Sequence, residues 1–123
     1  MAYTNTILLV DDSEIILKVL SFMIRKAGYN VLSASDGKKA LKFLDGGNID
    51  LAFTDLNMPE MNGIELITEI RRTERYRFMP VVLFIDDKEK ERKTIMETSG
   101  ATMLLDKNDI KEKVISTIKT MLD

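Results

Sequence analysis

Short apolar runs rich in β-branched residues alternate five times along this chain with segments whose apolar residues recur at helical spacing. The expected strands cover residues 7–10, 30–34, 51–54, 81–85 and 102–105. The expected helices cover residues 16–27, 36–45, 64–70, about 88–98 and 109–122. Strands that alternate with helices form a parallel sheet covered on both faces. The sequence therefore predicts a doubly wound α/β fold.

Length and composition narrow the class of protein. The 123 residues suit one domain with one core, so we expect a single domain over residues 1–123. No stretch approaches the ~18 apolar residues of a membrane span, and we expect no membrane contact and a cytoplasmic location. A formal net charge of −2 argues against direct binding of nucleic acid. The chain has neither His nor Cys, so carboxylates, hydroxyls, Lys or Arg must carry any chemistry.

Charged side chains stand where several of the expected strands end. Asp11 and Asp12 follow the first strand, Asp55 follows the third, and Lys107 lies just beyond the fifth. In a doubly wound sheet, ligands bind beyond the carboxyl ends of the strands. Three carboxylates crowded at this edge would repel one another unless a cation lay between them. A set of oxygen ligands without His or Cys favours Mg²⁺ over Zn²⁺.

Three sequence motifs resemble the receiver domains of two-component response regulators. They are Ile-Leu-Leu-Val-Asp-Asp at 7–12, Asp-Leu-Asn-Met-Pro-Glu-Met-Asn-Gly at 55–63, and Gly100-Ala101 ahead of Lys107. The resemblance covers nearly the whole chain in order and spacing. It implies a flavodoxin-like (βα)5 fold with strand order 2-1-3-4-5, and a signalling domain rather than an enzyme.

The resemblance also implies a role for each site residue. Asp55 would accept a phosphoryl group, and Asp11, Asp12 and the backbone carbonyl of Asn57 would hold Mg²⁺, one aspartate through water. Lys107 would pair with a phosphoryl oxygen. The implied donor is a histidine kinase or phosphotransfer protein. The implied output partner is a protein or domain that docks on the fourth helix, fifth strand and fifth helix.

Three positions depart from the receiver pattern. Ile85 ends the fourth strand, where receivers carry a Ser or Thr whose hydroxyl donates to the phosphoryl group. Leu104 replaces the aromatic residue that swings inward as that hydroxyl moves. Both residues suit the core of a sheet. The pattern therefore predicts a complete phosphorylation site without the usual signal-transmitting pair.

The third departure is Asn108, which replaces the proline after the lysine. In the family the bond before that proline is cis, and a non-proline cis bond costs about 3–4 kcal/mol. This loop must therefore tolerate strain or adopt a trans bond. Asn108 or Asp109 is also a good helix cap, and Asp109 with Glu112 has the spacing of a capping box.

Other functions remain as alternatives. A pseudo-receiver would bind a partner without phosphorylation; the three departures favour it, and the four charged site residues oppose it. A phosphatase with an Asp nucleophile and Mg²⁺ would need a second acid where Asn57 stands. A flavin site would need a loop rich in Gly and hydroxyls, rather than acids, after the first strand. The charged run at 88–93 is expected to be a solvated face rather than a docking site.

Overall fold

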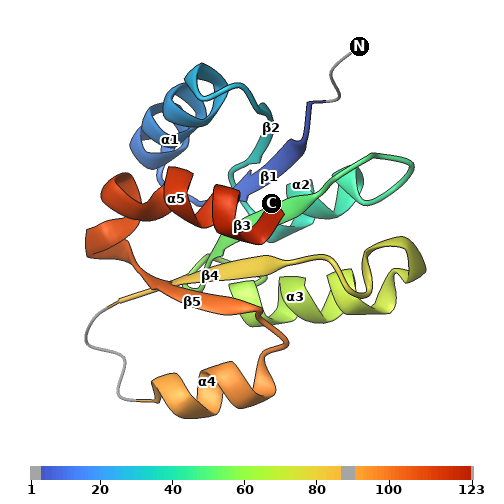
Figure 1. Ribbon diagram of the computed structural model, residues 1–123. Coiled ribbons are helices and arrows are strands. Elements are labelled where there is room, and N and C mark those ends of the chain that lie inside the picture. Colours follow the sequence, from blue (N-terminus) through green and yellow to red (C-terminus); the bar gives the residue numbers. More distant parts are fainter. Residues whose placement is uncertain (1–3, 87–90, 123) are drawn as a thin grey trace.

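Five parallel strands form one sheet in the computed structural model, which describes residues 4–86 and 91–122. They are β1 (Thr6–Val10), β2 (Asn30–Ala34), β3 (Leu51–Asp55), β4 (Val81–Ile85) and β5 (Met103–Asp106). Their order across the sheet is β2-β1-β3-β4-β5 (Figure 1). The predicted flavodoxin-like order is therefore confirmed.

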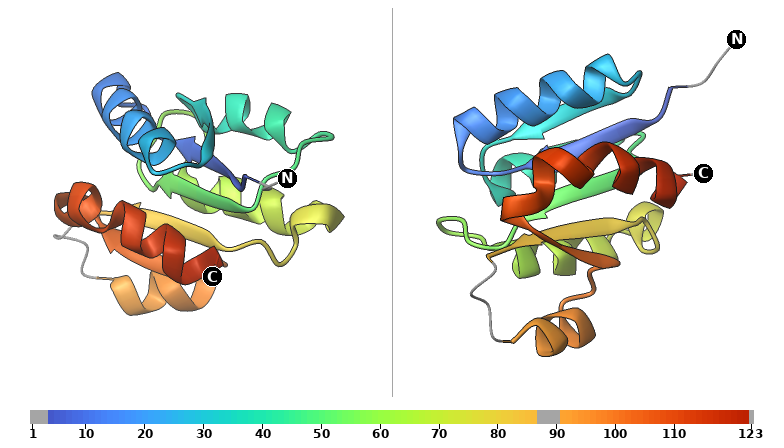
Figure 2. Two further views of the ribbon diagram at one scale, coloured as in Figure 1. Left: turned by 45° about the horizontal axis from the view of Figure 1, so that its top comes forward. Right: turned by 60° about the vertical axis from the view of Figure 1, so that its left-hand side comes forward.

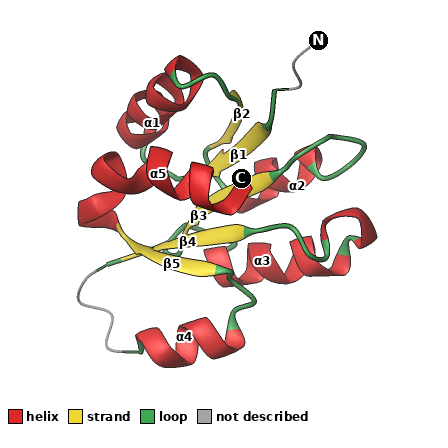
Figure 3. Cartoon of the chain, in the orientation of Figure 1, coloured by secondary structure: helices red, strands yellow, loops and turns green. Residues whose placement is uncertain are grey.

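Helices cover both faces of this sheet. They are α1 (Glu14–Lys26), α2 (Gly37–Phe43), α3 (Gly63–Arg72), α4 (Arg92–Thr98) and α5 (Ile110–Leu122), with 3-10 turns at Glu74–Tyr76 and Lys107–Asp109. The helices α1 and α5 lie together on one face, and α2, α3 and α4 lie on the other (Figure 2, Figure 3). Within the described residues, no helix combines the length and the apolar character that a membrane crossing requires.

The central strands are apolar on both sides because both of their faces are covered. Leu8 and Val10 of β1 pack in the cluster beneath α2 and α3, and Ile7 and Leu9 pack in the cluster beneath α1 and α5. All four residues are fully buried. Every residue of β3 is buried as well. This packing on both faces fixes the carboxyl ends of β1 and β3, where the predicted site lies.

Two helix starts differ from the sequence expectations. The fourth helix begins at Arg92 rather than near residue 88, and residues 87–90 lie outside the described residues. Residues 91–93, the described part of the charged run, are exposed as expected. The last helix follows a 3-10 turn in which Asp106 accepts a hydrogen bond from Asn108 N at 3.0 Å. The Asp109 carboxylate lies 3.5 Å from Lys113 Nζ, and the capping pair of Asp109 and Glu112 stays a prediction.

Candidate functional site

Three carboxylates meet at the carboxyl edge of the sheet because β1 and β3 are adjacent strands. Asp11 and Asp12 follow β1, Asp55 ends β3, and one carboxylate oxygen from each lies within 4.8 Å of the other two. Asp11 and Asp55 are buried, at 0% and 2% exposure, while Asp12 is exposed. The predicted convergence of these side chains is therefore present.

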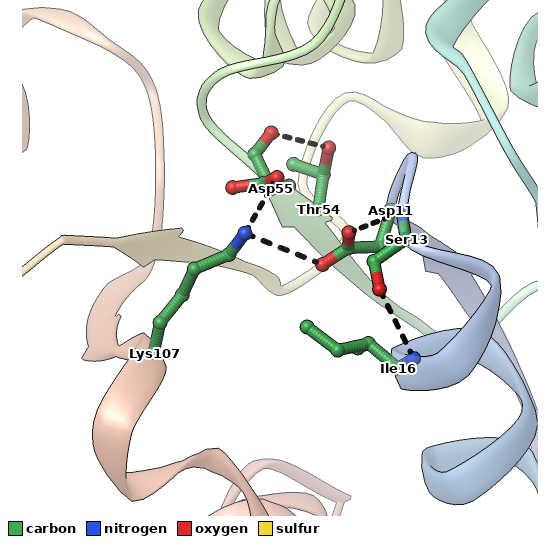
Figure 4. Close-up of polar contacts among 6 residues, drawn as sticks. All are labelled: Asp11, Ser13, Ile16, Thr54, Asp55 and Lys107. Carbon is green, nitrogen blue, oxygen red and sulfur yellow. Dashed lines mark hydrogen bonds and ion pairs between the residues drawn. The ribbon is translucent and has the colours of Figure 1, made fainter.

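Lys107 reaches this cluster from the turn that follows β5. Its Nζ lies 2.9 Å from Asp55 Oδ2 and 3.9 Å from Asp11 Oδ2 (Figure 4). The bond between Lys107 and Asn108 is trans, as are all peptide bonds in the described part of the chain. Of the two possibilities for this loop, the trans bond is therefore the one adopted.

The Asp11 carboxylate is only partly satisfied by the protein. Its Oδ1 accepts a hydrogen bond from Ser13 N at 2.9 Å, at the point where Ser13 caps α1. Its Oδ2 is buried and has no hydrogen-bond partner among the described residues. Burial raises the pKa of Asp11 to about 6, although the Ser13 bond lowers it. A buried carboxylate oxygen that faces other carboxylates matches the ligand chemistry of a hard divalent cation.

Asp55 and Lys107 influence each other's ionisation. Burial raises the pKa of Asp55 above its usual value, and the hydrogen bond and charge of Lys107 partly oppose that rise. Burial lowers the pKa of Lys107, but the hydrogen bond to Asp55 and the charge of Asp11 raise it by more, so the net shift is upward. Lys107 is therefore a cation at neutral pH, aimed at the carboxylate that ends β3.

The loop between β3 and α3 passes very close to Asp55. Asn57 is exposed in this loop, two residues after Asp55. Gly63 begins α3 and donates from its N to Leu56 O at 2.8 Å. A Cβ added at Gly63 would lie 2.2 Å from the backbone oxygen of Asp55 and 2.8 Å from a methyl group of Leu83. The glycine thus allows the close approach that sets the end of β3 against the start of α3.

The start of α3 carries a capping box that was not predicted from the sequence. Asn62 accepts from Glu65 N at 2.9 Å, and the Glu65 carboxylate accepts from Asn62 N at 3.0 Å, which together form a capping box. The Asn-x-x-Glu spacing at 62–65 was the available signal. This box holds the helix start that lies against Asp55.

The residues that depart from the receiver pattern lie in β4, β5 and the turn after β5. Ile85 is 1% exposed at the end of β4, and its register partner in β5 is Asp106. Leu104 is half-buried against the cluster beneath α2 and α3. Asp106 also pairs with Arg92 at the start of α4, with 2.9 Å between Arg92 Nη2 and Asp106 Oδ2. Sequence reasoning missed this ion pair because nothing in the spacing of the two residues indicates it.

Comparison with known proteins places this arrangement in a family. The model of the response regulator receiver domain matches residues 7–119. The chemotaxis protein CheY of Pseudomonas aeruginosa is 38% identical over 96 residues, which are 77% of this chain and 76% of that protein. The chemotaxis protein CheY-3 of Vibrio cholerae is 34% identical over 118 residues, which are 95% of this chain and 88% of that protein.

Some relatives are much longer than this chain. The CAI-1 autoinducer sensor kinase/phosphatase CqsS of Vibrio cholerae is 32% identical over 99 residues, which are 80% of this chain but only 14% of that kinase. A sequence of this kind therefore also occurs as a small part of a larger protein.

Solved structures agree with the sequence matches. Chemotaxis protein CheY4 of Vibrio cholerae has a TM-score of 0.90 at 32% identity and covers 98% of this chain and 100% of its own. Response regulator TrrA of Thermotoga maritima, solved in complex with Mg(2+)-BeF, has a TM-score of 0.82 at 27% identity, with 97% and 100% coverage. The chain belongs to the response regulator receiver family and is a receiver domain of the two-component type.

Proposed function

We propose that this receiver domain, spanning residues 1–123 in the cytoplasm, accepts a phosphoryl group on Asp55 and signals by contact with another protein. The observation that carries the proposal is the buried, unbonded Oδ2 of Asp11 beside Asp12 and Asp55, with Lys107 at the same edge. The donor would be a histidine kinase or phosphotransfer protein. The output partner would dock on α4, β5 and α5.

The chain's own oxygens suit a magnesium ion. Asp11, Asp12 and the backbone carbonyl of Asn57 would hold Mg²⁺ beside Asp55. Bound there, the ion would supply positive charge against the carboxylates and the incoming phosphoryl oxygens. The donor set fits because it consists of oxygens and because one of them is buried without a partner among the described residues.

Asp55 and Lys107 would carry the transfer. An ionised oxygen of Asp55 attacks the phosphorus, the bond from phosphorus to the donor breaks, and the donor leaves with that electron pair. Lys107 Nζ, already 2.9 Å from Asp55 Oδ2, offsets the negative charge that gathers on the aspartyl phosphate. Burial of Asp55 holds its carboxylate in one place, so its reactive oxygen meets the donor in a fixed orientation.

Mass spectrometry after incubation with acetyl phosphate and Mg²⁺ tests the phosphoacceptor. The parent should gain one phosphoryl group, and Asp55→Asn should gain none. Asp45→Asn, at an exposed carboxylate, is the matched control and should be modified like the parent. A modification that persists in Asp55→Asn, or is absent from the parent, contradicts the proposal.

Titration calorimetry with Mg²⁺ tests the metal ligands separately. Asp12→Ala should weaken binding strongly, because it removes one charged ligand from the cluster. Glu14→Ala removes an exposed acid just beyond the cluster and should change the affinity little. Equal affinities for parent and Asp12→Ala would show that the ion binds elsewhere.

A pseudo-receiver is the second candidate. The buried apolar Ile85 favours it, because it places no hydroxyl at the end of β4, where a phosphoryl group would be held. Such a domain would bind its partner equally well as Asp55→Asn and as the parent, and would gain no phosphoryl group from acetyl phosphate.

A further inference from the structure

A second concave surface lies along α1, outside the carboxylate cluster. A groove with a volume of about 1110 Å³ runs between α1, the carboxyl end of β2 and the start of α2. Leu17 and Phe22 give it an apolar wall, and Phe22 is 67% exposed. We define this surface as the α1–β2 groove.

The groove is strongly cationic, although the chain is acidic overall. Its lining includes four cations, Lys18, Arg25, Lys26 and Lys39, and one acid, Glu14. In the part of the chain that the structure describes, none of these cations forms an ion pair with a carboxylate. They would therefore gain from an anionic ligand without first losing a carboxylate partner.

The bonds that the cations do make are neutral. Arg25 donates to Val31 O at 3.3 Å, and Lys39 donates to the Ser35 hydroxyl at 3.0 Å. Lys26 lies over the Phe22 ring, 5.9 Å from its centroid. Such contacts hold the cationic groups beside the groove, and they do not neutralise the positive charge.

An open strand edge borders the same groove. β2 lies at one end of the strand order, so it pairs only with β1. Asn30 N donates to Asn5 O and Asp11 N donates to Ala34 O, so residues 30 and 34 turn their main-chain groups toward β1. Because these groups alternate along a strand, Val31 and Ser33 turn theirs to the open side, where Arg25 Nη2 already donates to Val31 O and leaves the groups of Ser33 for an added strand. Ser33 is exposed and lines the groove.

We propose that the α1–β2 groove binds an acidic segment of a partner protein in extended form, as a strand added to β2. Main-chain bonds to Ser33 would align the segment, an apolar side chain would rest against Leu17 and Phe22, and carboxylates would face the four cations. The apolar wall and the open edge favour a peptide over a nucleic acid, whose backbone uses neither. The groove excludes Asp55, so the inference does not depend on the proposed function.

An NMR titration of the full chain tests the proposal with one defined probe. The probe is a decapeptide in which glutamate alternates with phenylalanine or valine, and lysine replaces glutamate in the control peptide. The acidic peptide should shift the amide resonances of Val31 and Ser33, and the lysine peptide should not. Shifts centred on α4 and β5, or equal binding of both peptides, would overturn the proposal, as would no shift at millimolar acidic peptide.

Charge reversal separates the groove from general attraction between charges. The double variant Lys18→Glu with Lys39→Glu should weaken binding by about tenfold or more, which is about 1.4 kcal/mol. Its matched control, Lys111→Glu with Lys119→Glu on exposed positions of α5, should lower affinity far less. Both should keep the amide spectrum of the folded parent. An equal loss in the two double variants would mean that net charge, and not the groove, attracts the peptide.

The strand edge needs its own variants. Ser33→Pro removes an outward N–H that the added strand would use, whereas Ser33→Ala keeps it. Binding should fall in Ser33→Pro and persist in Ser33→Ala. Unchanged affinity in a folded Ser33→Pro variant would overturn the added-strand geometry. A single-stranded DNA or an anionic lipid vesicle that displaces the peptide with higher affinity would overturn the peptide as the occupant.

Discussion

The carboxylate cluster of Asp11, Asp12 and Asp55 and the α4–β5 region differ in how tightly their side chains are packed. At the cluster, Asp11 and Asp55 are almost fully buried at the ends of two strands that are covered on both faces. In α4, all of which is described, only Ile95 is buried, and Met96 is 40% exposed. A tightly packed support and a lightly attached helix thus lie on the same sheet.

The two regions suit different tasks: the packed cluster suits phosphoryl transfer, and the loosely packed helix suits signalling. Phosphoryl transfer requires a few atoms to be held in fixed positions, and buried strand ends supply that. A helix with few buried side chains can move at little cost in free energy. The departures from the receiver pattern at Ile85 and Leu104 fall between these regions and keep the core apolar. We therefore expect them to change the connection between the regions without unfolding either.

The largest effect should come from Gly63→Ala, which tests the packing that supports the cluster. The added methyl group would collide with the backbone oxygen of Asp55, which cannot move as a flexible side chain can. We expect a loss of about 3 kcal/mol or more in the free energy of unfolding, measured with urea. Gly37→Ala is the control, because the three atoms nearest to its methyl group all belong to the flexible Met61 side chain. Equal losses in the two variants would show that the cluster is not specially constrained.

The next effect is the pH dependence that Asp11 imposes when no divalent cation is bound. Burial raises the pKa of Asp11 from 3.8 to about 6, so the folded protein holds this proton in a pH range where the unfolded chain releases it. The contribution of Asp11 to the free energy of unfolding is complete below pH about 4. As the pH rises to about 6, this contribution is lost, and the free energy of unfolding falls by about 3 kcal/mol.

Asp11→Asn isolates this contribution. The variant should be more stable than the metal-free parent at pH 7, and the advantage should shrink as pH falls toward 4. Urea unfolding at several pH values measures the difference, and Asp45→Asn, at an exposed carboxylate, is the control. If the advantage of Asp11→Asn stays constant with pH, burial does not govern the ionisation of this carboxylate.

Much of this architecture could be predicted because it repeats along the chain. The short apolar runs and the helical spacing between them indicate the strands, the helices and the layers. Asp55 could be placed because a strand ended in an acid that a loop motif followed. Strand order came from resemblance, since local patterns do not encode which strands become neighbours.

The rest depended on contacts between distant segments. The pair of Arg92 with Asp106 forms only after α4 folds back beside β5, and neither residue is marked by its neighbours in the sequence. The α1–β2 groove likewise combines residues from three elements. The 3-10 turn over Lys107–Asp109 before the last helix was also not predicted.

A smaller effect concerns the connection between the two regions. Ile85→Thr would return a hydroxyl to the end of β4 and allow one charge-assisted hydrogen bond, worth about 1.5–3 kcal/mol, to a phosphoryl mimic. A contact made in only one state shifts the balance between states. We expect beryllium fluoride with Mg²⁺ to shift the amide resonances of α4 and β5 little in the parent and more in Ile85→Thr.

The second residue of the usual signal-transmitting pair is aromatic, and this chain has Leu104 in its place. Adding Leu104→Tyr to Ile85→Thr should increase the shift further, because a ring can then follow the hydroxyl inward. Ile85→Val, which adds no hydroxyl, is the control and should behave as the parent does. A parent that already shifts as fully as the double variant would show that this domain senses the phosphoryl group by another route.

The smallest effect should come from Arg92→Ala, which tests how α4 is attached. The ion pair is close, but the side chains of Arg92 and Asp106 are 47% and 15% exposed, so we expect a loss of only about 0.2–1 kcal/mol in the free energy of unfolding. The loss should be local: amide exchange should quicken in α4 and stay unchanged in β3, because only α4 loses an attachment. Lys93→Ala, at the next exposed position, should leave both rates unchanged. If Arg92→Ala instead quickens exchange equally in α4 and β3, the helix opens only with the whole domain, and the contrast between a firm site and a loosely held α4 disappears.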